Sequence, residues 1–501
     1  MRRLLTLALI VTLGLAVGCG SGSGGGSTPV GVPTTVTLSP SAGQFVASSG
    51  TLVITAAVAT GLSNTAVNWT LSGPGTLSSK TANPVTYTAP SSVTANTPVV
   101  VTATAAASSS STAYLPLTVL PAASVATANV LAISVDGGPA PPYPDGAFTS
   151  VTICSPGTTT CQTVDGILVD TGSEGLRVLS SEIANLSLTT LTDSNGNVLN
   201  DCAQFGDGSF TWGPVGLADV RISGEVAGGL PVQVISGTPP SGDCTGNNEN
   251  TAPLLGANGI LGIGLEPTDC YIPGTGSPCD SSTGLAGSPP PGTYYTCSSS
   301  GCSAAFVPVS DQVAVPTVYF SADNNGTVVT FPALAGSAAT LDGTLSFGIG
   351  TQTNNVLGSA VPYGVDANDN FVTLFVGQTL TSSFIDSGSN GLFFPSALTV
   401  CTDNASFYCA PLATTATNEG ASGTPIGTVN ITIDDADTLF LTGDSAFSTL
   451  GGPNGTVNTC AVDGSGSCSF DFGLPFFFGR SVFTAVDGQT TTAGTGPFWA
   501  Y

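Results

Sequence analysis

The sequence carries one short acidic pattern twice. The first copy is ILVDTGSEGL, which contains Asp170, and the second is FIDSGSNGL, which contains Asp386. In each copy an Asp follows an apolar run directly, and a turn of Thr or Ser, Gly and Ser leads on to Gly-Leu. This repetition predicts a duplicated half in which an acidic turn ends a strand.

An apolar stretch ending in glycine follows each acidic turn. Gly262 in GILGIG lies 92 residues after Asp170, and Gly479 in LPFFFG lies 93 residues after Asp386. We therefore predict that each half combines one acidic turn with one apolar strand that ends at a glycine. The aromatic run over 476–478 is predicted to form a core strand.

The charge balance limits the chemistry. The chain has no His, and 31 Asp and Glu outnumber 6 Lys and Arg, which gives a net charge of −25. The lack of His excludes Ser-His-Asp and Cys-His catalysis and His-ligated metal sites. With so few basic residues to neutralise phosphates, we expect no nucleic-acid partner. Hydrolysis would have to use carboxylates, hydroxyls or the few amines, and acid tolerance is expected.

Residues 1–18 have the form of an export signal. A basic MRR start precedes an apolar stretch over 4–17 that is too short for an ordinary membrane-spanning helix. The stretch ends in AVGC, which resembles the lipobox of bacterial lipoproteins. This resemblance implies that Cys19 carries lipid and anchors the protein in the bacterial cell envelope, at the outer membrane or cell surface. The alternative is a secretory signal without lipid. Residues 19–33 form the lipidated Cys and a Gly/Ser tether.

The cysteines support export. Of 13 Cys, 12 remain when Cys19 is set aside, and an even number is typical of a disulfide framework. The sequence does not determine their connectivity, but neighbouring positions favour short loops. No CxxC pair occurs, so neither a zinc cluster nor any other metal or cofactor is expected. The predicted pairs are Cys154–Cys161, Cys202–Cys244, Cys270–Cys279, Cys297–Cys302, Cys401–Cys409 and Cys460–Cys468.

Residues 34–121 are predicted to form a small β-sandwich. Short segments that alternate Val, Thr and Leu are separated by turn residues, and Trp69 is the expected core aromatic. The segment resembles the immunoglobulin-like modules of bacterial surface proteins. It would serve as a spacer or as a binder of carbohydrate or protein, and we favour the spacer.

Residues 129–501 form one large all-β unit, for which we predict two lobes, 129–340 and 341–501. The paired acidic turns resemble those of the pepsin-type aspartic peptidases. The resemblance implies a bilobal unit of double-ψ β-barrels. At closer range, this unit is similar to an uncharacterised family of exported bacterial proteins. Four further stretches carry it: a flap tip at Phe205, Gly206, Asp207 and Gly208, a first-lobe strand over 258–264, a hairpin over 318–331, and a second-lobe strand over 477–483.

The resemblance implies roles for the residues of both turns. Asp170 and Asp386 would form the catalytic pair, since two adjacent carboxylates do not both ionise easily and therefore share a proton. The ionised Asp would activate a water and the protonated one would polarise the scissile carbonyl. Around them, Gly172 and Gly388 would admit close backbone approach, Thr171 and Ser387 would bond across between the turns, and Ser173 and Ser389 would bond the carboxylates from outside.

The sequence departs from the family at two places. Phe205 stands where the flap usually carries Tyr, and Arg177 would lower the pKa of Asp170 if its side chain turned inward. We predict a surface-tethered aspartic endopeptidase-like protein that acts on a peptide or protein substrate. The alternative is a catalytically silent pepsin-fold binding protein or adhesin. Residues 193–197 and 366–370 resemble the start of calcium loops but lack the closing Glu, so we interpret them as turns.

Overall fold

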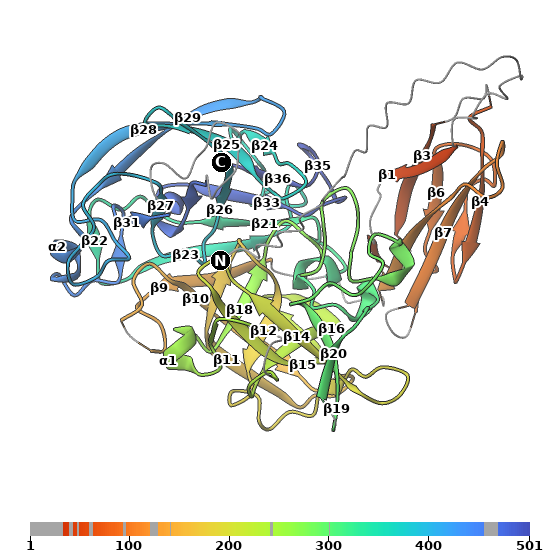
Figure 1. The fold of residues 1–501 in the computed structure, drawn as a ribbon, viewed down its shortest axis with the longest axis horizontal. Coiled ribbons are helices and arrows are strands. Elements are labelled where there is room, and N and C mark those ends of the chain that lie inside the picture. The colour runs from red at the N-terminus through yellow and green to blue at the C-terminus, as the bar shows by residue number, and fades with distance from the viewer. Residues whose placement is uncertain are drawn as a thin grey trace, which may run out of the picture.

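The structure is a computed structural model that describes residues 34–39, 44–47, 50–59, 64–93, 97–120, 129–140, 142–240, 244–299, 301–454 and 469–501. Nearly all the regular structure of these residues is β-strand (Figure 1), as expected for segments rich in Val, Thr and turn-forming Gly. Cys19, the residues before it, the tether and the predicted pair Cys460–Cys468 lie outside the described residues.

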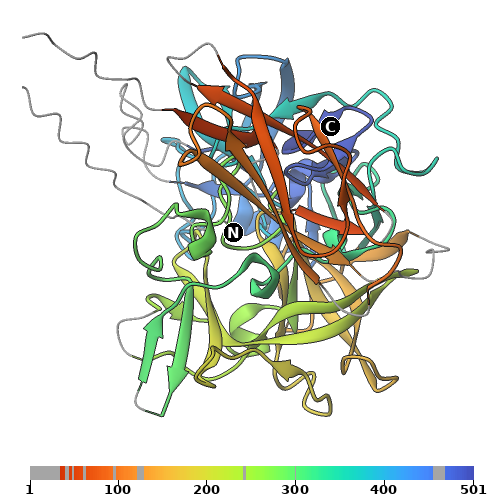
Figure 2. The ribbon, with the colours of Figure 1, turned by 90° about the vertical axis from the view of Figure 1, so that its right-hand side faces the viewer.

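The N-terminal part consists of two four-stranded sheets that share one core. Burial alternates along its strands, so that Val99, Val101 and Ala103 point inward from one strand. Trp69 is buried in this core, and its indole N–H donates to the carbonyl of Ala82 at 2.8 Å. Figure 2 shows this part in front of the two lobes. The first sheet contains β1 (Thr35–Ser39), β3 (Thr51–Ala59), β6 (Val85–Thr88) and β5 (Thr76–Leu77), and the second contains β2 (Gln44–Ala47), β8 (Thr112–Leu120), β7 (Thr97–Ala105) and β4 (Val67–Ser72).

Two lobes follow, one yellow to green and one cyan to blue in Figure 1. The first contains β9 (Val130–Val135), β10 (Ala147–Cys154), β11 (Cys161–Asp170), β12 (Glu174–Leu179), β13 (Thr189–Thr190), β14 (Val198–Gln204), β15 (Ser209–Ile222), β16 (Glu225–Ile235), β17 (Asn247–Asn248), α1 (Ala252–Leu255), β18 (Gly259–Ile263), η1 (Ser281–Thr283), β19 (Tyr294–Ser298), β20 (Gly301–Ala304), η2 (Val309–Asp311) and η3 (Pro316–Tyr319). Two strands lead into the second lobe and pair with its strands: β21 (Gly326–Thr330) and β22 (Ser337–Ala338). The second contains β23 (Leu341–Phe347), β24 (Pro362–Gly364), β25 (Phe371–Phe375), β26 (Gln378–Ile385), β27 (Leu392–Phe394), β28 (Leu412–Glu419), β29 (Ile426–Ile433), α2 (Ala436–Phe440), β30 (Ala446–Phe447), β31 (Gly451–Pro453), β32 (Asp471–Phe472), η4 (Leu474–Phe477), β33 (Ser481–Ala485), β34 (Thr490–Thr491), β35 (Gly494–Thr495) and β36 (Phe498–Ala500).

Both lobes contain the same crossed arrangement of strands around their acidic turn. In the first lobe, β18 lies between β11 and β12, parallel to the former and antiparallel to the latter, and β16 runs parallel to β12. In the second lobe, β32 lies between β26 and β27 in the same senses, and β31 runs parallel to β27. This duplication confirms the prediction of an all-β unit built of two similar halves.

The register corrects one expectation about the second lobe. Asp170 is paired with Gly262, as expected. Ile385 is paired with Phe472, and the backbone N–H of Asp386 donates to the carbonyl of Phe472. The second-lobe counterpart of Gly262 is therefore Gly473, and the prediction of Gly479 was wrong.

The aromatic run over 476–478 was also misassigned. It lies in the core, as predicted, but its first two residues belong to the 3-10 helix η4 rather than to a strand. Pro475 at the second position of this helix has no N–H to donate to a neighbouring strand, which is one reason why the segment is not a strand. The short strand β32 that precedes η4 takes the predicted place.

A single sheet connects the lobes. Its strands run in the order β10, β9, β23, β21, β33, β36 and β24, so first-lobe strands continue into second-lobe strands without a break. A buried contact adds to this connection: the carboxylate of Asp145 accepts from the backbone N–H of Phe447 at 2.7 Å. Burial raises the pKa of Asp145 well above its ordinary value. This connecting sheet includes β11, which leads to Asp170, whereas β26, which leads to Asp386, belongs to a separate seven-stranded sheet of the second lobe.

Five of the six predicted disulfides are present, and the sixth lies outside the described residues. They join Cys154 to Cys161, Cys202 to Cys244, Cys270 to Cys279, Cys297 to Cys302, and Cys401 to Cys409. Disulfides at this density are typical of exported proteins. Across the residues that the structure describes, no helix is long and apolar enough to span a bilayer.

The disulfides should differ in their contribution to stability. Cys202–Cys244 closes a sequence separation of 42 residues, whereas Cys297–Cys302 closes 5. Loop entropy predicts that replacing the first pair with Ser lowers the free energy of unfolding by about 4 kcal/mol, against about 2 kcal/mol for the second. Denaturant unfolding of the two double variants measures this difference. Equal losses would contradict the prediction.

Candidate active site

The two acidic turns face each other across the lobes. Asp170 is the last residue of β11 and Asp386 follows β26 directly, so a buried strand carries each carboxyl group to the interface. An added Cβ on Gly172 would lie 2.5 Å from Cγ of Asp386, and one on Gly388 would lie 2.6 Å from Oδ1 of Asp170. Each Asp therefore lies directly over the glycine of the other turn. No larger residue fits at either glycine without displacing a carboxyl group.

Backbone and hydroxyl groups bond the turns to each other with near two-fold symmetry. The N–H of Thr171 donates to Oγ of Ser387 at 3.1 Å, and the N–H of Ser387 donates to Oγ1 of Thr171 at 2.9 Å. Each hydroxyl then donates across the interface, Thr171 to the carbonyl of Ile385 at 3.2 Å and Ser387 to that of Val169 at 2.8 Å. All four groups are buried, so breaking one bond would leave an unpaired polar group.

The first-lobe turn holds its own carboxylate. The N–H of Gly172 donates to Oδ1 of Asp170 at 2.8 Å, and the hydroxyl of Ser173 donates to Oδ2 at 2.5 Å. Burial raises the pKa of Asp170 to about 6, and the charge of Asp386 and a hydrogen bond with it act in the same direction.

The second-lobe turn supplies more donors. Oδ1 of Asp386 accepts from the N–H of Gly388 at 2.7 Å and from that of Ser389 at 3.2 Å, while Oδ2 accepts from the Ser389 hydroxyl at 2.9 Å. Burial raises the pKa of Asp386, but the hydrogen bonds from Asp170 and Ser389 act against it, and this pKa lies below its ordinary value. Two buried, interacting carboxyl groups with unlike environments share one proton over an acidic pH range.

Arg177 does not act on the pair in the way the sequence allowed. Its side chain is buried, and Nη2 donates to Oδ2 of Asp269 at 2.8 Å and lies 3.6 Å from Oδ2 of Asp201. Asp269 also accepts from the hydroxyl of Tyr294 at 2.5 Å. The guanidinium charge is therefore neutralised within the first lobe. The side chain connects β12 to Asp269 and does not turn toward Asp170.

The predicted flap tip is a tight turn between β14 and β15. The N–H of Phe205 donates to the carbonyl of Ser209 at 2.9 Å, and Oδ1 of Asp207 accepts from the Ser209 hydroxyl at 2.7 Å. Gly206 and Gly208 complete the turn. The Phe205 ring is 6% exposed and belongs to a core cluster with Leu168 of β11. The ring thus belongs to the core that also includes a side chain of the strand before the first acidic turn.

The sequence did not point to Tyr143 or Glu249 as candidate site residues. Burial raises the pKa of Tyr143, and the charges of Glu249, Asp170, Asp386 and Asp207 add to the shift, so the phenol lies near both the pair and the flap tip. Burial also raises the pKa of Glu249 to about 7, with the charge of Asp207 next in size. Neither lies in a repeated motif, and only the chain path between β9 and β10 brings Tyr143 to this place.

Behind the second turn lies a further carboxyl group, that of Asp471, which the sequence analysis did not identify. Oδ2 of Asp471 lies 2.6 Å from the Ser389 hydroxyl, the same hydroxyl that bonds Asp386. Asp471 follows an aromatic residue in a Gly-rich stretch, and nothing in that pattern signals a contact with the pair.

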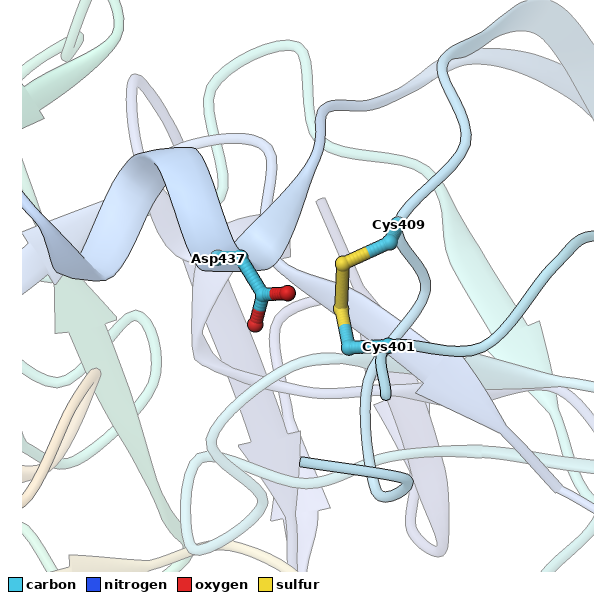
Figure 3. Close-up of side chains that lie close together, drawn as sticks. All are labelled: Cys401, Cys409 and Asp437. Carbon is cyan, nitrogen blue, oxygen red and sulfur yellow. A yellow bond between two sulfur atoms is a disulfide. The ribbon is translucent and has the colours of Figure 1, made fainter. Parts of the chain in front are cut away.

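Three features that resemble metal sites are accounted for by local bonding. Cys401, Cys409 and Asp437 place ligand atoms within 4.8 Å of one another, but Figure 3 shows that the two sulfurs are joined in a disulfide and offer no thiolate. At 193–197, Oδ1 of Asp193 accepts from the backbone N–H groups of Asn195 and Asn197, and the turn at 366–370 is built in the same way.

The packing over the glycines yields a stability prediction. In Gly388→Ala the new Cβ must displace the Asp170 carboxyl, which should lower the free energy of unfolding by about 1–3 kcal/mol. Gly287→Ala is the matched control, because its Cβ would meet no atom within 4 Å and should change stability by less than about 0.5 kcal/mol. Denaturant unfolding compares the two. Similar values for both would show that the pair is not closely packed.

Comparison with known proteins places the chain in a family. The crystal structure of aspartic proteinase from Irpex lacteus is similar over 74% of this chain and 96% of that chain, with 13% identity and a TM-score of 0.42, and a likeness at this level assigns no activity. A search of curated proteins returned no match. Residues 125–501 match a family model described as "Protein of unknown function (DUF3443)", so the chain belongs to that family.

Proposed function

We propose that the protein is an aspartic-type endopeptidase that hydrolyses peptide bonds in peptide or protein substrates. The observation that supports this most directly is the juxtaposition of Asp170 and Asp386, each over the glycine of the opposite turn. Buried, differently bonded carboxyl groups can hold one acid and one base at the same pH, which is what acid–base hydrolysis needs.

The chemistry follows from this pairing. The ionised carboxylate removes a proton from a water molecule, and the water oxygen attacks the scissile carbonyl carbon. The protonated carboxyl donates a hydrogen bond to the carbonyl oxygen as negative charge develops there. The proton taken from water then passes to the leaving amine, and the shared proton returns to the pair. The four cross-bonds of Thr171 and Ser387 hold the two groups in place throughout.

A silent cleft protein or adhesin on the same fold is the competing function. Phe205 favours it, because the flap tip presents no hydroxyl from this position. We further propose that the protein is exported and lipid-anchored in the bacterial cell envelope, where its disulfides persist.

The catalytic prediction concerns the pair. Asp170→Asn and Asp386→Asn should each reduce cleavage of an unfolded protein substrate by more than roughly 10³-fold, because the two groups act as one unit. Circular dichroism and unfolding should show that both variants stay folded. The exposed Asp403→Asn is the matched control and should cleave like the unmodified protein. Cleavage that survives either substitution would contradict the assignment, and binding of a pepstatin-type inhibitor without any cleavage would favour the silent function.

The pH dependence follows from the raised pKa of Asp170. Cleavage requires the shared proton, so activity should fall as the pH rises through about 6, where the pair loses it. It should also fall at the acid end, where both groups are protonated. A rate profile between pH 2 and 8 measures both limbs. Activity that is flat from pH 5 to 8 would exclude a proton shared by these two groups.

The anchoring prediction concerns Cys19. Cys19→Ser removes the only thiol that could be lipidated at the end of the signal and should move the protein from the membrane fraction to the soluble fraction. Ser21→Ala, two residues away, is the control and should stay with membranes. Fractionation followed by immunoblotting measures the distribution. Membrane association of Cys19→Ser would argue against a lipid anchor.

A further inference from the structure

The two lobes differ at one position directly behind their acidic turns. In the first lobe, Leu168 of β11 is paired with Ile260 of β18. In the second lobe, the equivalent residue Phe384 of β26 is paired with Asp471 of β32. Each of these pairs lies two residues before the catalytic Asp of its lobe. A carboxyl group therefore occupies in one lobe the place that an isoleucine side chain occupies in the other.

Asp471 contacts the pair through a single hydroxyl group. The Ser389 Oγ lies 2.6 Å from Oδ2 of Asp471 and 2.9 Å from Oδ2 of Asp386. A serine hydroxyl has one proton, so it can donate to only one of these oxygens. The contact with the other oxygen is a hydrogen bond only if that carboxyl group is itself protonated and donates to the serine.

The surroundings favour the protonated form of Asp471. Its side chain is 7% exposed, and its second oxygen, Oδ1, is buried without a hydrogen-bond partner among the described residues. An ionised carboxylate in this place would leave a charged oxygen unsolvated, which is costly. The neighbouring strands β26 and β27 contain no ionisable residue. Of the described charges, those of Asp386 and Asp170 face it and oppose a third negative charge.

We propose that Asp471 is a positioning residue that stays protonated and donates to Ser389, so that the Ser389 hydroxyl donates to Asp386. This chain of two hydrogen bonds makes Asp386 the ionised member of the pair and Asp170 the member that carries the proton. The assignment rests on the proposed function and deepens it by giving each carboxyl group one role. Ser173 occupies the matching place in the first lobe, where Ile260 can donate nothing.

A protonated Asp471 also affects the stability of the fold, independently of catalysis. Burial and the charge of Asp386 raise the pKa of Asp471 well above the ordinary 3.8. The unfolded chain releases this proton near pH 4, whereas the folded protein retains it, so the stability that Asp471 contributes is complete below that range and is lost as the pH rises through the folded pKa. An asparagine at this position cannot ionise and escapes that loss.

The first experiment compares thermal unfolding of Asp471→Asn with that of the unmodified protein between pH 4 and 8. The Tm difference, variant minus unmodified, should become more positive as the pH rises. Asp403→Asn, an exposed acid, should show no such trend. A Tm difference for Asp471→Asn that is constant with pH would mean that Asp471 ionises normally, which would overturn the proposal.

The second experiment identifies the ionised member of the pair without any substrate. A small epoxide alkylates a carboxylate: the carboxylate oxygen forms a bond to carbon, the epoxide C–O bond breaks, and water supplies the proton for the resulting hydroxyl. Peptide mapping after reaction at pH 4–5 should place the ester on Asp386. In Asp471→Leu, which cannot donate to Ser389, at least a third of the ester should move to Asp170. Modification of Asp170 in the unmodified protein would overturn the proposal.

The third experiment separates this proposal from the proposed function. Asp471→Asn can donate an amide N–H to Ser389, so it should retain cleavage within about 3-fold at pH 4–5, whereas Asp471→Leu should lose roughly 10-fold or more. If the unmodified protein labels at Asp386 but cleaves nothing, the proposed function fails and the assignment of charge stands. If Asp471→Asn and Asp471→Leu have the same pH profile and the same loss, the role of Asp471 is merely steric and the proposal fails.

Discussion

The close contact between two carboxyl groups across the lobe interface is the constraint on which the rest of the site depends. Asp170 and Asp386 repel each other when both are ionised, so the fold must hold them together against that repulsion. The cross-bonds between the two turns do this, because they connect backbone and hydroxyl groups that are buried and have no alternative partner in water. The turns also lack a Cβ where the opposite carboxyl group lies, which removes the steric barrier to the approach.

The strands behind the turns explain why this geometry can be rigid. The strand before each acidic turn pairs with a strand that crosses behind that turn, and a sheet made of strands from both lobes connects them. Moving either acidic turn within its lobe would therefore break ladder hydrogen bonds to the strand that crosses behind it. The ion pair of Arg177 with Asp269 has a similar bracing role, since it closes the first lobe behind β12. The positive charge of Arg177 is neutralised by Asp269 and does not act on Asp170 and Asp386.

The near two-fold symmetry of the turns ends at the hydrogen bonds behind them. Both turns offer a glycine N–H and a serine hydroxyl, but only the second turn has Asp471 behind its serine. A shared proton is sensitive to such a difference, because a single extra donor can shift it from one carboxyl group to the other. In the function that we propose, this difference in the hydrogen bonds behind the turns divides the acid and base roles between two residues that occupy equivalent places.

The disulfide pairs were predicted from a preference for short loops, and the roles of Thr171, Ser387 and the turn glycines from a resemblance to the pepsin-type aspartic peptidases. The sequence by itself determined the features that depend on local pattern, which are the all-β class and the duplicated turns. These follow from residue types at short spacing, and the same pattern in two copies implied that both turns meet. The sequence could not assign Gly473 in place of Gly479, because strand register is set by pairing between distant segments. Nor could it show the direction of Arg177, the packing of Phe205, or the approach of Tyr143 and Asp471 to the pair. Those depend on which chain segments the tertiary structure brings together, since a carboxyl group acquires its properties from neighbours in space rather than in sequence.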